Sequence, residues 1–422
     1  MKAQRVQTTG IGMVLILVWL LSGFTPVMAM NDSGEQITVS GVVRDKLNKR
    51  KLEYVNISVP GSNIGTVTNA DGEFTLVIKT SLRPQAVEVS HVGYVNDRLK
   101  LNGADLLNQE IWLTPYVNLL GEVTVHGQNP LLIVQEAIRK VPLNYSTSSN
   151  LLNGFYREIA QKGRRYINIS EAIVDVYKTG YGEPLTKDRV QIDKGRRLLS
   201  SKQSDTLAVK LLGGPTMFVY LDVVKNPDFL LDPQALSDYH FIMEEPTSID
   251  NRAQFVIRFE PRVIQPYALC YGKLYIDKER LSFTRAEFSL SLDDKNKATQ
   301  AILKRKPFGL RFKPLEVSYL VTYKTLNGVT YLNYVRNNIR FKCDWKRKLF
   351  STTYTVLSEM VVTDRQESPV DPISFKASFK PSQVFSDRVD DFGNEDFWKG
   401  YNIIEPTESL ENAVAKLKKQ QK

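Results

Sequence analysis

Residues 41–76 constrain the fold of this chain more than any other stretch. They form short segments of alternating apolar and polar side chains, separated by turn residues. Val55-Asn56-Ile57-Ser58-Val59 alternates apolar and polar side chains, which is the period-two pattern of a half-buried β-strand. Pro60-Gly61 and Asp71-Gly72 are turn dipeptides, because proline presets φ and glycine accepts a positive φ. The stretch therefore predicts short β-strands joined by tight turns.

The order of residues in this stretch resembles the carboxypeptidase-like regulatory domain. The matching positions begin at Gly41-Val42-Val43-Arg44-Asp45, continue through Gly65-Thr66 and Asp71-Gly72, and end at Ser90-His91-Val92-Gly93-Tyr94. The resemblance implies a transthyretin-like β-sandwich over residues 36–115. It also implies an adhesive or scaffolding module, because this domain brings no catalytic residues.

The N-terminus has the pattern of an export signal. Lys2 and Arg5 precede the apolar run Ile11–Leu21, and Val27-Met28-Ala29 is a small-residue cleavage site. The apolar run has 11 residues, whereas a membrane-spanning helix needs about 20. No later stretch is apolar enough for a span, so we expect an exported protein without a transmembrane segment after signal removal. Its expected location is the periplasm, or an association with the outer membrane.

The rest of the chain reads mainly as β-structure. Segments rich in Tyr, Val, Phe and Thr, such as Tyr166–Tyr177 and Tyr331–Lys342, are bounded by turn signals such as Asn327-Gly328. The expected fold is a transthyretin-like sandwich followed by a larger antiparallel β-sheet or incomplete barrel with a few helices. The expected parts are a signal peptide at 1–29, the sandwich at 36–115, a linker and helix at 116–150, a β-rich domain at 151–365, and an extension ending in a helix at 366–422.

Two further motifs carry a second resemblance. Gly154-Phe155-Tyr156-Arg157-Glu158 starts the β-rich region, and Phe397-Trp398 with Tyr401-Asn402-Ile403-Ile404-Glu405-Pro406 lies near the C-terminus. In these motifs the chain is similar to exported Bacteroides-type proteins that carry the same N-terminal domain and an uncharacterised C-terminal region. The resemblance implies a place in the cell envelope rather than an activity.

Residues of familiar catalytic sites are sparse. The three histidines, His91, His126 and His240, belong to no His-x-x-Glu or His-Glu-x-x-His motif. The sequence contains no Gly-x-Ser-x-Gly, no phosphate-binding loop and no dinucleotide fingerprint. We therefore expect no catalytic, cofactor-binding or metal-binding residues, and favour a protein that is not an enzyme. A peptidase or glycan-acting hydrolase with an unassembled site remains an alternative.

Two basic runs are candidate contacts for an anionic ligand. They are Lys304-Arg305-Lys306 and Arg347-Lys348, and aromatic residues such as Phe308 and Trp345 lie beside them. In an exported protein the expected partner is an anionic lipid or lipopolysaccharide rather than nucleic acid. The alternative is an ordinary solvated strand end.

The chain has two cysteines, Cys270 and Cys343, and both fall in predicted strands. An oxidising compartment would permit a disulfide between them. The alternative is that each is a small buried apolar side chain.

Three functions follow as hypotheses. The first is a non-catalytic envelope binding or assembly protein that uses the sandwich as a docking module for an envelope protein. The second is a periplasmic carrier of lipid or lipopolysaccharide, in which the curved sheet wraps an apolar cavity. The third is the hydrolase already mentioned.

Overall fold

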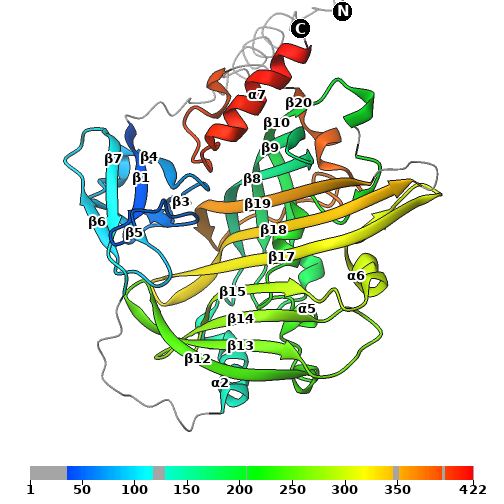
Figure 1. Cartoon of the computed structure of the whole chain (residues 1–422). Coiled ribbons are helices and arrows are strands. Elements are labelled where there is room, and N and C mark those ends of the chain that lie inside the picture. Colours follow the sequence, from blue (N-terminus) through cyan, green and yellow to red (C-terminus); the bar gives the residue numbers. More distant parts are fainter. Residues whose placement is uncertain (1–35, 117–128, 206, 346–350, 392–394, 422) are drawn as a thin grey trace, which may run out of the picture. The chain divides into compact units, whose positions relative to one another are not determined.

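The computed structural model describes residues 36–116, 129–205, 207–345, 351–391 and 395–421 (Figure 1). The fold is mainly β, with two small N-terminal sheets and one large antiparallel sheet, which confirms the expected fold class. The expected signal peptide lies outside the described residues. In the described ranges, no helix combines the length and the apolar character needed to cross a membrane.

The N-terminal part consists of two sheets that face each other across a common apolar core. The three-stranded sheet has the order β4-β1-β7, with β4 (Glu73–Lys79), β1 (Gln36–Asp45) and β7 (Leu106–Leu113). The four-stranded sheet has the order β3-β2-β5-β6, with β3 (Gly65–Val67), β2 (Asn56–Ser58), β5 (Ala86–Ser90) and β6 (Asp97–Lys100).

The alternation seen in the sequence sets the core of this sandwich. Val55, Ile57 and Val59 are buried, as the period-two pattern predicts. Gly72 occupies a turn with φ +71°, and a Cβ at this position would lie 2.8 Å from the carbonyl oxygen of Val43. Only glycine fits this turn without strain.

Residues 117–128 lie outside the described part of the chain, and the β-rich region follows. It opens with α2 (Pro130–Arg139), whose N-cap Asn129 accepts a 3.0 Å hydrogen bond from the Leu131 amide, and continues with α3 (Val141–Asn144). The other helices are α4 (Thr216–Tyr220), α5 (Pro227–Leu230), α6 (Lys295–Ile302) and α7 (Glu408–Gln421). Short 3-10 turns are η1 (Thr80–Leu82), η2 (Leu185–Lys187), η3 (Gln203–Asp205), η4 (Leu236–Asp238), η5 (Phe385–Arg388) and η6 (Glu395–Trp398).

The large sheet has 11 strands in the order β12-β13-β14-β15-β17-β18-β19-β8-β9-β10-β20, and its two end strands do not pair. Its strands are β12 (Tyr239–Ile249), β13 (Arg252–Pro261), β14 (Cys270–Asp277), β15 (Phe283–Leu290), β17 (Leu310–Leu326), β18 (Val329–Trp345), β19 (Thr352–Glu367), β8 (Asn150–Lys162), β9 (Arg165–Lys178), β10 (Arg189–Leu199) and β20 (Asp390–Asp391). A separate pair joins β11 (Lys210–Leu211) to β16 (Leu303–Arg305).

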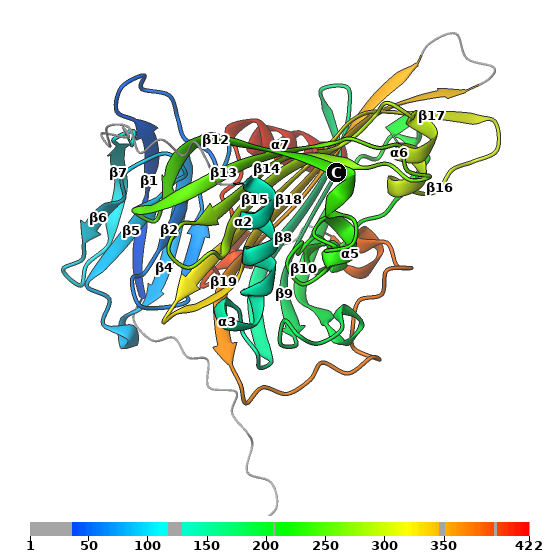
Figure 2. The ribbon, with the colours of Figure 1, turned by 90° about the horizontal axis from the view of Figure 1, so that it is seen from below.

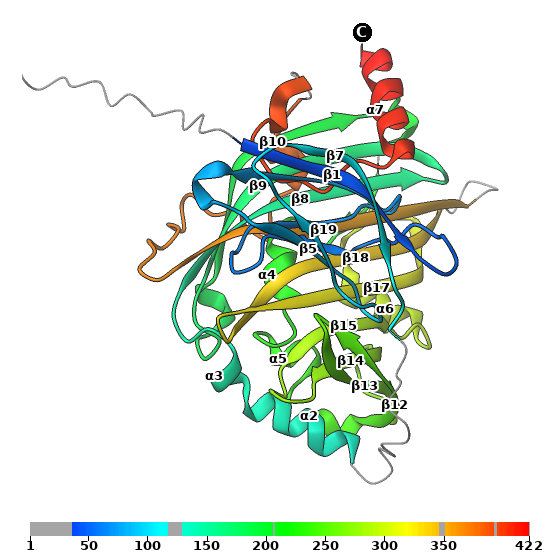
Figure 3. The same ribbon diagram turned by 90° about the vertical axis from the view of Figure 1, so that its left-hand side faces the viewer.

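The two faces of the large sheet are covered by different segments. The inner face carries Tyr156, Ile339 and Val356, and α2, α4 and α5 pack on it in one apolar cluster. Figure 2 shows α2 and α5 beside the strands. Arg157 lies on the outer face, because successive residues of each strand point alternately to the inner and the outer face. On the outer face α7 lies beside β9 and β10 (Figure 3), with Leu410 and Leu417 buried against those strands.

The C-terminal motif connects the N-terminal sheets with the outer face. Arg157 donates to the carbonyl oxygens of Ile404, at 2.7 Å, and Glu405, at 3.3 Å. On the other side, Thr66 donates to the carbonyl of Ile403 at 2.8 Å. Asn402 bonds both the amide and the carbonyl of Val77 on β4, at 2.7 and 3.0 Å. The two motifs singled out in the sequence therefore meet in the fold.

Candidate ligand-binding cavity

A cavity of about 380 Å³ lies on the inner face of the large sheet. Its floor is formed where β18, β19 and β8 lie side by side. Two transverse rows of residues in register make up this floor. The polar row is Asn337, Ser358 and Glu158, and the apolar row is Ile339, Val356 and Ala160.

The polar row interrupts an otherwise apolar surface. Asn337 is only 4% exposed, and within the described residues its Oδ1 atom has no hydrogen-bond partner. Ser358 is 5% exposed beside it. Buried polar atoms in proteins are almost always hydrogen-bonded, so this unpaired amide oxygen, on a residue that lines the cavity, is a candidate contact for a ligand donor.

Glu158 is the acidic member of the polar row. The hydroxyl of Tyr156 donates to its Oε2 atom at 3.1 Å. Burial raises the pKa of Glu158 above its usual value, and the hydrogen bonds from Tyr156 and from the Gly214 backbone only partly oppose this effect. Burial therefore shifts this carboxyl towards its protonated form, compared with an exposed glutamate.

Replacing Glu158 with glutamine is expected to change how stability depends on pH. A carboxyl whose pKa is raised in the folded state stabilises the fold below the unfolded pKa and loses that contribution as the pH rises through the folded pKa. The free energy of unfolding of the Glu158→Gln variant should not decrease between the unfolded and the folded pKa of Glu158. At higher pH, the variant should be more stable than the wild type. Urea unfolding over a pH series measures this. The exposed Glu245→Gln variant is the control and should keep the wild-type slope.

The roof of the cavity comes from two segments far apart in the sequence. Its apolar residues are Leu207, Val209, Leu211, Leu212, Pro381, Val384 and Phe385. Phe385 anchors the second segment, because its ring packs edge-on against Tyr156, with 4.9 Å between the ring centroids. The roof therefore carries many apolar side chains, and the lining also includes polar ones beyond the floor row, among them Asn168, Ser200 and Gln383.

Basic residues lie at the rim of the cavity. Lys210 on β11 and Lys304 on β16 both line it, and these two short strands pair with each other. The Nζ atom of Lys304 donates to the Pro381 carbonyl at 2.5 Å. Besides Glu158, the acidic residues of the lining are Asp205 and Asp387, and Asp205 is already bridged to Arg165 and Lys162.

The structure separates the residues predicted as anionic contacts. Lys304 lines the cavity, whereas Arg305 and Lys306 are exposed beyond it. The Nζ atom of Lys306 donates to the Leu310 carbonyl at 2.8 Å. Arg347 and Lys348 lie outside the described residues.

The two cysteines do not form a disulfide. Both are buried free thiols. Cys270 begins β14 and Cys343 lies near the end of β18, and β15 and β17 run between these strands. β14 and β18 are therefore three strand spacings apart, which is about 14 Å. A disulfide between the two cysteines would need their Cα atoms within about 7 Å. Burial raises the pKa of Cys270 to about 12 and that of Cys343 to about 11, so both remain protonated at neutral pH.

The histidines do not assemble a catalytic or metal site in the described part of the chain. Burial, aided by Arg285, lowers the pKa of His91 to about 3, and its ring packs 5.4 Å from that of Tyr94. His240 is exposed, 3.7 Å from Glu260, and His126 lies outside the described residues. Among the described residues, no group of three or more His, Cys, Asp or Glu side chains could hold a metal ion.

A larger hollow of about 900 Å³ lies on the outer face and has a different character. Most of its charged side chains are paired, although the Nε atom of Arg336 has no hydrogen-bond partner among the described residues. Lys273 bridges Glu244 at 2.6 Å, and Arg258 lies 3.4 Å from the same carboxylate. Arg285 is bonded to Glu287 in the same way. Because most of these charges already have partners, the inner cavity is the stronger candidate site.

Sequence reasoning missed the members of the polar row as site residues. Glu158 was noted only as part of Gly154-Phe155-Tyr156-Arg157-Glu158. The sequence did contain a signal for Glu158. Tyr156, Glu158 and Ala160 are alternate residues of one strand and so share a face, and Tyr156 and Ala160 are both suited to a protein core. An acidic side chain at an inward position of such a strand points to a functional site.

Comparison with known proteins identifies one domain of known family and several solved structures with low similarity to part of the chain. Residues 39–125 match the model of the CarboxypepD_reg-like domain. No curated protein matches the chain.

Three solved structures resemble part of the chain. A putative outer membrane lipoprotein-sorting protein domain from Vibrio parahaemolyticus is 11% identical and covers 58% of this chain and 94% of its own, with a TM-score of 0.26. A LolA superfamily protein from Nitrosomonas europaea is 14% identical and covers 58% and 97%, with a TM-score of 0.23.

A DUF1329 family protein from Desulfovibrio piger is 10% identical and covers 57% and 95%, with a TM-score of 0.24. These TM-scores are too low for the likenesses to support a conclusion about ligand or function. The chain carries a CarboxypepD_reg-like domain at residues 39–125.

Proposed function

We propose that this chain is a non-catalytic binding protein of the cell envelope that holds one small amphiphile in the inner cavity. The observation that carries the proposal is the cavity itself, with a cluster of apolar side chains in its roof, a polar and an apolar row in its floor, and two lysines in its lining. Ligand sites of proteins are mostly apolar concavities of about 300–1,000 Å³ with a few placed polar groups. The 380 Å³ cavity is at the small end of this range, which suits one acyl chain rather than a multi-chain lipid.

The polar groups specify the ligand further. The unpaired Asn337 Oδ1 atom requires a donor, such as a hydroxyl or amide on the ligand chain. Lys210 and Lys304 at the rim suit an anionic end group such as a carboxylate or phosphate. An anionic amphiphile with a hydroxylated acyl chain meets both requirements.

Filling the cavity should abolish most of the binding. The Ala160→Leu variant adds three carbons to the floor, where Ala160 is 3% exposed, and so removes room for about three methylene groups. Each buried methylene contributes about 0.8 kcal/mol, so affinity for a fluorescent analogue of laurate should fall on the order of 50-fold. Fluorescence titration measures the affinity.

The matched control enlarges the cavity instead of filling it. Val356 lies directly opposite Ala160 on β19, so the Val356→Ala variant should retain the probe at wild-type affinity or better. Circular dichroism confirms that both variants are folded. Equal affinities of the wild type and the folded Ala160→Leu variant would contradict the proposal.

Replacing Asn337 with leucine should change ligand preference more than stability. The variant removes a buried amide oxygen that has no partner, so the free energy of unfolding should stay the same or rise. A hydroxylated laurate should lose its advantage over plain laurate by about 1–2 kcal/mol, the value of one buried hydrogen bond. Competition titrations give this ratio. An unchanged ratio would show that Asn337 does not contact the ligand.

A docking role for the N-terminal sandwich is a second candidate. Strands β6 and β7 are edge strands of its two sheets, and β3 and β4 are the opposite edges. On β7, Leu107 is 52% exposed and Trp112 is 37% exposed, and aromatic side chains are enriched at protein interfaces. A Trp112→Ser variant that no longer co-purifies with an envelope protein, while still binding the laurate analogue, would support this role.

A further inference from the structure

The end of the sheet next to the cavity rim carries a concentration of basic residues. This basic tip comprises residues 304–313, which join β16 to β17, and residues 340–345 at the end of β18. Its exposed cations are Lys304, Arg305, Lys306, Arg311, Lys313, Arg340 and Lys342. Asp344 is the single acidic residue in these two stretches.

Two of the cations are placed where they repel each other. Lys313 on β17 and Lys342 on β18 are direct cross-strand partners. Like charges at directly opposite positions destabilise a sheet. Asp344 lies 3.8 Å from Lys313, and Glu316 is the cross-strand partner of Arg340, so these two carboxylates still leave an excess of cations at the tip. An anionic surface would supply the missing countercharge.

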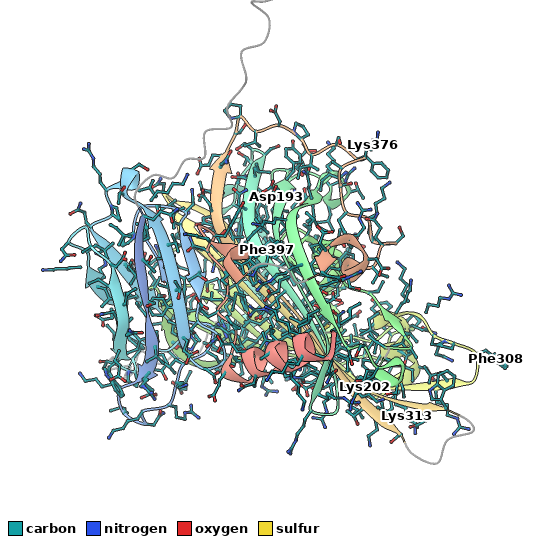
Figure 4. All side chains as sticks on the ribbon, turned by 90° about the horizontal axis from the view of Figure 1, so that it is seen from above. Asp193, Lys202, Phe308, Lys313, Lys376 and Phe397 are labelled. Atoms are coloured by element: carbon teal, nitrogen blue, oxygen red, sulfur yellow. The ribbon has the colours of Figure 1, made fainter. Side chains whose placement is uncertain are left out.

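The basic tip also presents aromatic side chains to solvent. Phe308 is 99% exposed, and Trp345 is 38% exposed at the end of β18. Figure 4 shows the Phe308 side chain at the end of its loop, pointing away from the ribbon, with Lys313 on the same side of the sheet. Aromatic residues among lysines and arginines are typical of segments that lie in the headgroup region of a bilayer.

The packing of the hairpin end does not depend on its exposed strand cations, although Lys304 and Lys306 of the tip donate to the carbonyls of Pro381 and Leu310. The end of the hairpin is held by inward residues, since Phe312 and Phe341 pack 4.7 Å apart and both are buried. The exposed cations alternate with them along each strand and face the other way. A surface that adds repulsion without packing is better explained by a partner than by stability.

We propose that the basic tip docks on the surface of an anionic phospholipid bilayer, with Phe308 inserted at headgroup depth. Lys304 belongs both to this tip and to the cavity rim, so docking would bring the rim close to the membrane surface. The proposal goes beyond ligand binding, because the tip would dock whether or not the cavity is filled.

Charge removal tests the electrostatic part. Arg305, Arg311 and Lys342 are exposed, and the triple variant with glutamine at all three positions should bind more weakly to vesicles of phosphatidylcholine with phosphatidylglycerol. Each cation near such a surface contributes about a fivefold factor, so the loss should be on the order of 100-fold. The control triple variant, Lys46→Gln, Lys100→Gln and Lys416→Gln, removes the same charge elsewhere and should bind like the wild type. Vesicle sedimentation of the full chain gives the partition coefficients. Equal binding of the two triple variants would overturn the proposal.

A local probe tests the insertion of Phe308 independently of the rest of the chain. Both native cysteines are buried, so a Phe308→Cys variant can be labelled selectively with a polarity-sensitive fluorophore. We expect a blue shift with anionic vesicles and none with pure phosphatidylcholine. The same label on the Leu47→Cys variant, at a 74% exposed position of the N-terminal part, should not respond. No shift at position 308 with anionic vesicles would overturn the proposal in favour of an acidic protein partner.

Discussion

Replacing Arg157 with methionine is expected to lower the free energy of unfolding by about 3–5 kcal/mol. Arg157 is 2% exposed, and its guanidinium lies 2.8 Å from Glu171 and donates to two carbonyls of the C-terminal motif. Burial alone would raise the pKa of Glu171, but the guanidiniums of Arg157 and Arg196 outweigh it and hold that pKa below its usual value. Without Arg157, the buried Glu171 would lose one of its two arginine partners and keep Arg196, and the two carbonyls would lose their side-chain donor. The midpoint of urea unfolding measures the effect.

An exposed arginine provides the control for this variant. Arg98 bridges Glu88 at 3.4 Å with most of its side chain in solvent. Exposed pairs contribute about 0–1 kcal/mol, so the Arg98→Met variant should be nearly as stable as the wild type. If the Arg157→Met variant were equally stable, Arg157 would not be what holds the C-terminal motif on the sheet.

The second large effect is expected for Asp222→Asn, again about 3–5 kcal/mol. Asp222 is fully buried between α4 and α5, and its Oδ2 atom lies 2.7 Å from the Nζ atom of Lys178 on β9. Its Oδ1 atom accepts a 2.7 Å hydrogen bond from the Tyr323 hydroxyl. The carboxylate thereby fixes the segment containing α4 and α5 to the inner face. An uncharged amide would leave the buried ammonium of Lys178 without its nearest counterion.

The matched control is the same substitution six residues further along the chain. Asp228 is exposed in the first turn of α5, so the Asp228→Asn variant should stay within about 0.5 kcal/mol of the wild type. Thermal and urea unfolding of both variants give the comparison. A small effect at Asp222 would mean that apolar packing alone holds α4 and α5 in place.

Local patterns were enough to predict much of the fold. The alternation around Ile57 and the glycine turn at Gly72 specify the N-terminal sandwich, because burial of one strand face and positive φ are properties of short stretches. The long strands β17 and β18 and the turn at Asn327-Gly328 were predicted for the same reason, and both turn residues have positive φ.

Contacts between distant parts of the chain could not be predicted in this way. The hydrogen bond of Arg157 with Ile404 joins residues 247 positions apart, and no local pattern encodes it. The polar row of the cavity depends on the register of β18, β19 and β8, which only the folded sheet fixes. The sheet order likewise separates Cys270 from Cys343, although both were correctly placed in strands.

Native mass spectrometry of the full chain, purified from its own cell envelope with lipids retained, tests the central claim most directly. The account predicts one stoichiometric anionic amphiphile bound to the wild type and little or none on the folded Ala160→Leu variant. A bare wild-type protein, or equal occupancy of the two proteins, would contradict the claim that the inner cavity is the binding site.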